Sequence, residues 1–585
     1  MKKIFTTIVA IFAIGVASTA PISEQQARRI AIEFFSGGTR SGAVEVSLEW
    51  SGRTLQNAAI QRSVVKNSSD ALLYIYNRGD NNGFVIVSGD DKSRPIIAFS
   101  HEGCFDAGNI APSTRALLSA WCEQIEATGN GVTPSQKYSA SVGVEECRYD
   151  TALWNQSEPF NNEAPVYEGY RSITGCVATA MSIICYYNKW PENGVGTTPS
   201  YTHKDEWNIT RTVYANTLGR KYDYNNMLAN YNSSYTSTQA AAVAALMYDM
   251  GTSVKMSYSP SFSGASSSNV PVALSTYFGY SKSCQLVYRG NKSDKEWVDM
   301  LKTNIATYGP TYFSGNDTQS GHAFVLDGYT SENYFHINYG WGGYGNGYYW
   351  IPDIEYFNQQ DALFYLAPDK NGTSTYTDSI SLIPFATSSY NYYGLSSLAA
   401  TYKSGEAFTI RIGGIYNTGN ISFSGDVRVV HCNNSGDVKG SIVTMRITDL
   451  PPAYYMYFNP RCRISSTIEE GDRIRFQYKG VYSQDWQWAR GAEANCVDEI
   501  LLKATPEEVA KSLDISYSKS NKVFTFNSTN AIQYTVKKAV DNSVIASGEV
   551  ASHTATAIDL STLDAGEYLF EFASGGRPYV LRIVL

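Results

Sequence analysis

The sequence contains no apolar segment long enough to anchor the protein in a membrane. Its longest such run extends from Ile4 to Val16, which is 13 residues, whereas a membrane-spanning helix needs about 20. Two lysines precede this run, and small residues ending at Ala20 follow it. This arrangement is typical of a secretory signal peptide. We therefore expect residues 1–20 to be a signal peptide and the protein to be secreted or held at the cell surface, with no membrane span.

The sequence also lacks a cluster of positive charge. Its net charge is -8, and no basic block stands out along the chain. Nucleic acid is therefore excluded as an expected partner. At 43% hydrophobic and 17% charged residues the composition is that of a globular protein, not of a disordered chain.

Metal-binding patterns are missing as well. No two cysteines stand two to four residues apart, and the six histidines are scattered singly, so the usual zinc-site spacings are excluded. We predict no metal and no cofactor. The nine cysteines are an odd number, and an exported chain of this kind keeps at least one free thiol.

The length of 585 residues predicts about four domains. After residue 20, the Ser23 to Gln26 segment has the form of a capping box before an amphipathic helix. Strand patterns follow at 71–76, 83–89 and 95–100. Residues 21 to about 126 are thus predicted to form a small α+β domain, and the polar stretch from Thr128 to Glu146 an exposed linker.

Beyond the linker, residues 147–368 mix helical and strand patterns, and the rest of the chain is rich in short strands. Residues 369–503 are predicted to be a β-sandwich-like module and residues 504–585 a C-terminal β module. Thr505-Pro506 marks the boundary between them. The fold class expected for the whole chain is α+β with all-β modules at the C-terminus.

One cysteine stands at the expected start of a helix. Gly175 ends a loop, residues 177–190 contain no glycine or proline, and Pro191 stops the run. Cys176 is therefore predicted at a helix N-terminus, where unpaired N–H groups and the helix dipole lower the pKa of a thiol. A cysteine nucleophile requires this environment. Cys185 falls on the opposite helix face and is excluded as a disulfide partner.

A histidine opens an apolar strand pattern, Gly321-His-Ala-Phe-Val-Leu-Asp-Gly328. A second strand is predicted at 334–338, so that the two form a hairpin. If the turn is centred on Thr330, His322 and Asn338 lie opposite each other, each eight residues from it. Asn338 then holds one ring nitrogen of His322 and leaves the other for a thiol, as in a Cys-His-Asn site.

The order and separation of these residues are compatible with such a site. His322 follows Cys176 by 146 residues, within the range noted for papain-type enzymes. His336 is a competing base, because it shares a strand face with Asn338. Its alternative role is that of a buried, hydrogen-bonded strand residue.

Together these motifs resemble the streptopain family of bacterial cysteine peptidases over residues 21–368. The matching segments are Gly83-Phe-Val-Ile-Val-Ser-Gly-Asp-Asp91, Trp154-Asn-Gln156, Gly175-Cys-Val-Ala-Thr-Ala-Met181, Gly321-His-Ala-Phe-Val-Leu-Asp-Gly328 and His336-Ile-Asn-Tyr-Gly-Trp-Gly-Gly343. The family commonly has Trp after the Asn, where this chain has Tyr339.

The resemblance implies a papain-like catalytic domain at 147–368, preceded by an inhibitory pro-domain and linker at 21–146. It implies a secreted cysteine endopeptidase made as a zymogen, which cleaves proteins or peptides through a thioester and is inhibited by its own pro-domain. Cys176 matches the nucleophile, His322 the base and Asn338 the residue that orients the base. Gln156 matches the side chain that forms an oxyanion hole with the backbone N–H of Cys176.

The last strands, up to Leu585, resemble the sorting domains of type IX secretion, although a plain terminal β hairpin explains them nearly as well. Type IX secretion machinery is thus one predicted partner. Two alternative functions remain open. One is a surface-binding protein with a decayed peptidase core, and the other is a different thiol hydrolase of the amidase or transglutaminase type.

Overall fold

The computed structural model describes most of the chain after residue 20. The described residues are 21–36, 44–53, 71–110, 112–129, 141–290, 292–316, 321–351, 360–386, 391–397, 399, 401–493, 496–526, 531–552, 556–574 and 577–585. The predicted signal peptide and most of the predicted linker lie outside them. The chain divides into two compact units, the first consisting of residues up to Ser267 with Ser293–Ala362, the second of Ser268–Lys292 with Leu363–Leu585.

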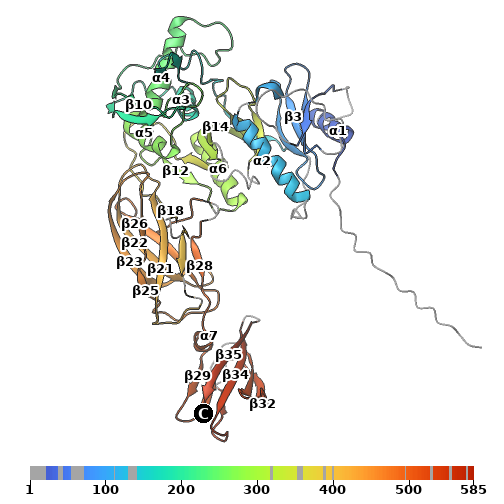
Figure 1. Ribbon diagram of the computed structural model, residues 1–585, viewed down its shortest axis with the longest axis vertical. Coiled ribbons are helices and arrows are strands. Elements are labelled where there is room, and N and C mark those ends of the chain that lie inside the picture. The colour runs from blue at the N-terminus through green and yellow to red at the C-terminus, as the bar shows by residue number, and fades with distance from the viewer. Residues whose placement is uncertain are drawn as a thin grey trace, which may run out of the picture. The chain divides into compact units, whose positions relative to one another are not determined.

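The N-terminal part of the first unit combines an antiparallel sheet with two helices. Helix α1 (Glu24–Phe35) begins after Ser23, and the reciprocal hydrogen bonds between Ser23 and Gln26 confirm the predicted capping box. In Figure 1, α1 lies beside β3 of the sheet. The elements are β1 (Ser47–Gly52), β2 (Leu73–Asn77), β3 (Phe84–Ser88), β4 (Ile96–Ser100), the 3-10 helix η1 (Ala107–Asn109) and α2 (Pro112–Gly129). The three predicted strands of this region are confirmed as β2, β3 and β4.

This sheet continues into the part of the chain that carries Cys176. Strand β4 pairs with β16, and the sheet runs on through β15, β14 and β13 to β17, while β5 also pairs with β14. Phe99 of β4 stacks on Tyr348 of β16, with ring centroids 5.0 Å apart. The strands are β5 (Glu145–Arg148), β13 (Thr311–Asn316), β14 (Gly321–Thr330), β15 (Tyr334–Asn338), β16 (Gly347–Trp350) and β17 (Asp361–Phe364).

Helices cover this central sheet, and α3 packs against both α4 and β14. The helices of this part are α3 (Cys176–Asn188), α4 (Ser237–Ser253) and α6 (Asp294–Tyr308). Short elements connect them: β6 (Val166–Tyr167), β7 (Tyr170–Arg171), β8 (Thr197–Thr198), β9 (Tyr201–Lys204), β10 (Thr210–Val213), β11 (Asn216–Thr217) and the 3-10 helix η2 (Ser267–Asn269). The mixture of helices and strands confirms the predicted α+β class.

The predicted linker from Thr128 to Glu146 is partly wrong. Its first residues lie in α2, and its last residues pair with β14 as part of β5. Polarity suggested an exposed segment here, but a short polar strand forms because β14 offers it backbone partners. The backbone N–H of Ser331 donates to the carbonyl of Val144 at 2.8 Å. The hydrogen bonds between this segment and the β14–β15 hairpin therefore begin one residue before β5.

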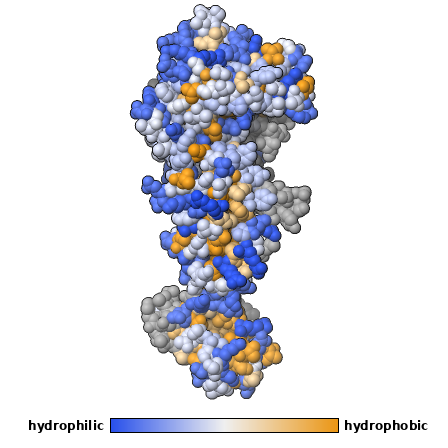
Figure 2. All heavy atoms as spheres, turned by 90° about the vertical axis from the view of Figure 1, so that its left-hand side faces the viewer, coloured by the Kyte–Doolittle hydropathy of each residue, from blue (hydrophilic) through white to orange (hydrophobic). Residues whose placement is uncertain are grey.

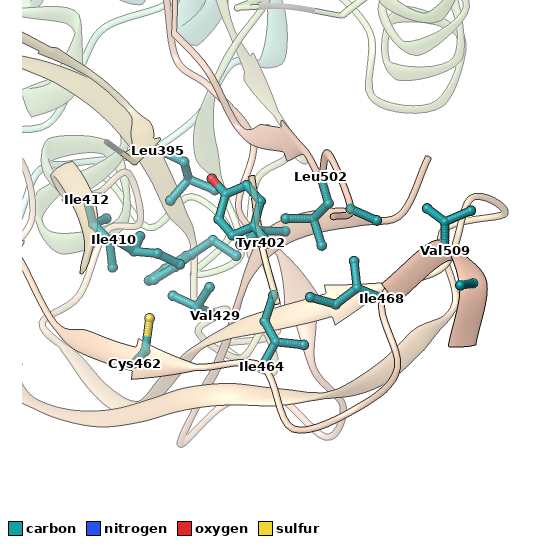
Figure 3. Close-up of a cluster of buried hydrophobic side chains, with 14 of the residues drawn as sticks. Leu395, Tyr402, Ile410, Ile412, Val429, Cys462, Ile464, Ile468, Leu502 and Val509 are labelled. Atoms are coloured by element: carbon teal, nitrogen blue, oxygen red, sulfur yellow. The ribbon is translucent and has the colours of Figure 1, made fainter. Parts of the chain in front are cut away.

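The second unit contains a β sandwich, as predicted. Its strands are β18 (Ile380–Ala386), β19 (Asn391–Tyr393), β20 (Leu395–Ser397), β21 (Ala407–Asn417), β22 (Phe423–Cys432), β23 (Val438–Leu450), β24 (Tyr455–Phe458), β25 (Arg461–Arg463), β26 (Arg473–Gly480), β27 (Gln487–Trp488) and β28 (Glu499–Leu501). One sheet is built around β21 and the other around β22 and β26. Figure 3 shows Ile410 and Ile412 of β21 beside Val429 of β22, where the two sheets bury their apolar faces. The same unit holds α5 (Val270–Tyr277) and β12 (Gln285–Tyr288).

The predicted C-terminal module opens with a short helix. Thr505 caps α7 (Pro506–Ser512), and its hydroxyl accepts from the N–H of Glu508. A three-stranded sheet and a four-stranded sheet follow. Their strands are β29 (Ile515–Ser518), β30 (Val523–Phe526), β31 (Ile532–Lys538), β32 (Val544–Val550), β33 (Thr556–Asp559), β34 (Glu567–Ser574) and β35 (Arg577–Val584). The predicted β-rich C-terminal region is thus confirmed.

The surface drawn in Figure 2 is mainly hydrophilic, with small apolar groups scattered between polar side chains. Within the described part of the chain, no helix is both long and apolar enough to cross a membrane. All nine cysteines are free thiols, so the expected unpaired cysteine is present.

Candidate active site

The backbone around Gly175 places Cys176 at the first position of α3, as predicted. Gly175 has φ +84°, which disfavours any residue with a side chain, and a Cβ there would lie 2.6 Å from the Met256 sulfur. Helical hydrogen bonding starts at once, because the N–H of Thr179 donates to the Gly175 carbonyl at 3.1 Å. Cys185 is fully buried. The thiol of Cys176 is therefore held at a helix N-terminus by a glycine that no other residue can replace without strain.

His322, the second residue of β14, contacts Cys176. Burial raises the pKa of the Cys176 thiol, but the charge and hydrogen bond of His322, with backbone hydrogen bonds from Ala323 and Val177, outweigh it and lower the pKa. The imidazole is stacked on Trp341, with ring centroids 5.9 Å apart and planes 14° from parallel. A lowered thiol pKa beside a histidine fits a cysteine nucleophile and its base.

The predicted register of the hairpin is wrong. Asn338 pairs with Val325, not with His322. The turn lies at residues 331–333, where Asn333 has φ +67° and its N–H donates to the Thr330 carbonyl. The register also shifts between residues 326 and 328. A bulge and a late turn leave no periodic signal, so the alternation of the two strands could not reveal them.

The group that contacts the second nitrogen of His322 is a backbone carbonyl. Nε2 of His322 lies 3.1 Å from the oxygen of Tyr339, and donates to it when protonated. Asn338 directs its own side chain elsewhere, because its amide donates to Thr151 and to the carbonyl of Ala152. Its oxygen accepts from the N–H of Gly340 at 3.1 Å. Sequence reasoning missed Tyr339 in this role, because a backbone acceptor leaves no residue-type signal.

Gln156 lies in a chain segment that is hydrogen-bonded to the loop before Cys176. Its carbonyl accepts from the N–H of Thr174 at 3.0 Å, two residues before Cys176. Its own N–H donates to the Asn155 side chain at 2.7 Å. The Gln156 residue is 3% exposed. Three of the four predicted site residues are thus grouped around α3 and β14, while Asn338 lies one residue from the carbonyl that contacts His322.

His336, the competing base, is occupied by a different partner. Its Nδ1 lies 2.5 Å from a carboxylate oxygen of Asp327, and its ring meets Tyr348 edge-on at 5.0 Å. His336 is buried in this pair. The geometry therefore favours the hydrogen-bonded strand residue that was the alternative expectation for His336.

Two family models match the chain. The model of the peptidase C10 family matches residues 154–349, and the model described as Spi protease inhibitor matches residues 19–125. The first contains Cys176, His322, Asn338 and Gln156, and the second contains β1 to β4.

Curated proteins with similar sequences include two named cysteine proteases. The chain is 30% identical over 367 residues to the thiol protease/hemagglutinin PrtT of Porphyromonas gingivalis, an alignment that covers 60% of this chain and 41% of PrtT. It is 33% identical over 302 residues to streptopain of Streptococcus pyogenes serotype M1, covering 48% of this chain and 74% of streptopain.

Solved structures of interpain A from Prevotella intermedia are also similar. A prointerpain A fragment gives a TM-score of 0.45 at 26% identity and covers 57% of this chain and 100% of the fragment. The active wild-type enzyme gives a TM-score of 0.34 at 29% identity, covering 40% of this chain and 98% of that enzyme. Because it is 33% identical to streptopain over a stretch that covers 74% of that enzyme, the chain belongs to the peptidase C10 family of cysteine peptidases.

Proposed function

We propose that the protein is a secreted cysteine endopeptidase, made as a zymogen, that hydrolyses peptide bonds with Cys176 as nucleophile and His322 as base. The observation that carries this proposal is the contact between these two residues at the start of α3. It lowers the pKa of a thiol that burial alone would raise. A thiolate at neutral pH is the species that attacks a peptide carbonyl.

The proposed reaction proceeds through a thioester. The Cys176 thiolate attacks the carbonyl carbon of the scissile bond, and the carbonyl oxygen becomes an oxyanion. The backbone N–H of Cys176 and the side chain of Gln156 are proposed to bind this oxyanion. Protonated His322 gives its proton to the leaving amine as the C–N bond breaks. His322 then accepts a proton from water, which attacks the thioester and releases the acid product and the thiolate.

We assign the orientation of His322 to the carbonyl of Tyr339. This acceptor fixes Nε2 as the protonated nitrogen and leaves Nδ1 for the thiol. Asn338 is proposed to act on His322 indirectly, through this carbonyl. Its side-chain oxygen accepts from the N–H of Gly340 and so sets the direction of the Tyr339 carbonyl. The Cys-His-Asn site expected from the sequence thus becomes a Cys-His pair with a backbone acceptor.

The pro-domain proposal rests on how residues 21–126 join the rest of the first unit. Their sheet shares hydrogen bonds with the peptidase part through β4 and β16. Helix α2 reaches the loop after Tyr339, where a Cβ on Gly345 would lie 3.2 Å from the hydroxyl of Thr114. A domain so placed beside the site can restrict substrate access. We expect the purified precursor to be nearly inactive and to gain activity as a fragment of about a hundred residues is lost.

A time course of peptide hydrolysis, followed together with intact mass, tests this zymogen proposal. The precursor that carries Cys176→Ala should stay full length unless another protease is added. Full activity in a precursor that still carries residues 21–126 would contradict the proposal.

Export is proposed to use the N-terminal signal peptide and the C-terminal module. The chain ends in the antiparallel pair β34 and β35, which is compatible with recognition by type IX secretion machinery. A chain that stops before Thr505 should then accumulate inside the producing cell while it still crosses the inner membrane. Unchanged appearance of this shortened chain in the medium would exclude the sorting role.

The central experiment combines an irreversible cysteine-peptidase inhibitor with a protein substrate. After processing, the inhibitor should label Cys176 and stop casein hydrolysis, and peptide mapping should find Cys185 unlabelled. Labelling without hydrolysis would favour another thiol hydrolase. The absence of both labelling and hydrolysis would favour a binding protein with a decayed core.

A further inference from the structure

A buried carboxylate joins three side chains behind the hairpin that carries His322. Asp327 is completely buried. It accepts from His336 at 2.5 Å and from the Thr151 hydroxyl, and it pairs with the guanidinium of Arg148 at 3.2 Å. A buried carboxylate is costly unless charges and hydrogen bonds compensate it. Asp327 therefore requires these partners to stay in place.

The hydroxyl of Thr151 transmits this requirement to Asn338. A threonine has one proton to donate and two lone pairs to accept with. Because the carboxylate of Asp327 can only accept, the proton of Thr151 goes to Asp327, and the hydroxyl accepts from the Asn338 amide at 2.8 Å. The other N–H of that amide donates to the Ala152 carbonyl at 2.9 Å. Both amide protons are thus assigned. If the amide flipped, its oxygen would face two acceptor oxygens, those of Thr151 and Ala152.

The fixed amide determines where the Tyr339 carbonyl points. The oxygen of Asn338 is left to accept from the N–H of Gly340, which closes a tight turn around Tyr339. Gly340 has φ +72°, and a Cβ there would lie 3.0 Å from Thr179 of α3. The turn is therefore held from both sides. Its carbonyl meets Nε2 of His322 at 3.1 Å.

We propose that Thr151 and Asp327 are positioning residues for His322, and that residues 145–151, of which the first two fall in the predicted linker, must stay in the mature enzyme. This inference rests on the proposed peptidase function. These residues touch neither Cys176 nor His322 directly but act through Asn338 and the Tyr339 carbonyl. Their effect falls on the orientation of the base, and hence on turnover more than on substrate binding.

The backbone of residues 144–149 supports the same assignment. Strand β5 pairs with β14 at Gly328, and the N–H of Tyr149 donates to the Asp327 carbonyl at 2.7 Å. A Cβ on Gly328 would lie 2.7 Å from the Cys147 carbonyl, so this close approach needs a glycine. Strands β5 and β14 therefore belong to one sheet. Cleavage that removed residues 145–151 would leave the carboxylate of Asp327 without two of its three partners.

Processing must therefore cut before Glu145 to give a fully active enzyme. N-terminal sequencing of the self-processed wild-type protein, matched to its specific activity, tests this without any variant. The expected active species begins before Glu145. An equally active species that begins after Thr151 would overturn the inference, whatever the variants show.

The variant test compares Thr151→Val with Thr151→Ser and with a matched control. Thr252→Val is the control, because the buried Thr252 hydroxyl also accepts from an asparagine amide, that of Asn216, but lies on α4. We expect Thr151→Val to lose about 10-fold to 100-fold in kcat with KM within about twofold. Thr151→Ser should recover kcat to within about threefold of wild type. Thr252→Val should keep the wild-type kcat even if its melting temperature falls as much as that of Thr151→Val.

Two readouts, the pH dependence of Cys176 alkylation and kcat, separate positioning from general instability. Alkylation of Cys176 against pH should shift to higher pH in Thr151→Val, because a misplaced His322 stabilises the thiolate less. Equal kcat losses in Thr151→Val and Thr252→Val, or unchanged kcat in Thr151→Val, would overturn the inference while the wild type remains active. A wild type that neither hydrolyses casein nor labels at Cys176 would overturn the proposed function, and this inference with it.

Discussion

Nε2 of His322 lies 3.1 Å from the carbonyl oxygen of Tyr339, so the proposed catalytic base is held by the main chain of the residue that follows Asn338. A side-chain substitution cannot remove this acceptor. It can only move the turn that presents it. Substitution of Cys176 or His322 should therefore abolish activity, whereas substitution of the residues around them should only reduce it.

Replacing Cys176, the proposed nucleophile, should abolish hydrolysis without unfolding the chain. Cys176→Ala removes the only thiol at the start of α3, and we expect a loss of at least about 1000-fold in kcat/KM. Cys185→Ala, in the same helix and fully buried, is the control and should keep most of the activity. The assignment fails if refolded Cys176→Ala digests casein at the wild-type rate.

His322→Ala should be as inactive as the nucleophile variant, and it should change the pH dependence of thiol alkylation. In the wild type the lowered pKa of Cys176 means that the thiolate forms at lower pH than in an ordinary cysteine. Without His322, burial raises the pKa, so the alkylation rate should rise only at higher pH. His336→Ala is the comparison: it removes one partner of Asp327 but not the proposed base, so we expect a partial loss of kcat, like that of Thr151→Val and far smaller than that of His322→Ala. Reversed losses would mean that His336 is the base.

Asp361 should make the first unit less stable as pH rises. Burial raises the pKa of Asp361 to about 7, whereas an unfolded aspartate titrates near 4. Between these values the folded state keeps a proton that the unfolded state has lost, so stability falls as pH rises from about 4 to about 7. The loss amounts to a few kcal/mol, at about 1.4 kcal/mol per pH unit.

Asp361→Asn removes this titration and can still accept from the Ser314 hydroxyl, which lies 2.5 Å from the carboxylate. We expect the variant to melt several degrees above the wild type at pH 8 and close to it at pH 4. Both proteins should carry Cys176→Ala to prevent self-digestion. Melting temperatures that differ equally at both pH values would contradict the assignment.

Loosening the contact between the pro-domain sheet and β15 should speed activation. The hydroxyl of Tyr334 donates to the buried carbonyl of Ile96 at 2.6 Å, and Tyr334→Phe removes this bond at a cost of about 1 kcal/mol or more. The precursor should then mature several times faster, and the mature enzyme should keep its kcat. Tyr329→Phe offers a control on the neighbouring strand. Identical maturation of Tyr334→Phe and wild type would show that this bond does not limit activation.

Local signals in the sequence were enough to place Cys176 at the start of a helix and His322 near the start of a strand. Gly175 precedes the helix that begins at Cys176, and this helix ends at Asn188, shortly before Pro191. The apolar pattern after His322 likewise predicts a strand correctly. Both depend on the preferences of a few consecutive residues, which a sequence displays directly.

Features that depend on pairing between distant segments were not predictable in the same way. The register of Asn338 depends on the shift near Asp327 and on the position of the turn. Strand β5 is only Glu145–Arg148 and has a polar sequence, so its place in the sheet is decided by β14 and not by its own composition. The Tyr339 carbonyl acts through backbone geometry, which residue types do not encode.

The shared sheet of the precursor has a consequence for the mature protein. If residues 21–126 are removed as proposed, β16 loses its pairing with β4 and becomes an edge strand whose N–H and C=O groups are open to a new partner. The ring of Tyr348, stacked on Phe99 in the precursor, is uncovered at the same time. Maturation would therefore expose a sheet edge that is covered in the precursor. Among mature molecules at high concentration, strand addition and self-association should begin at this edge of β16.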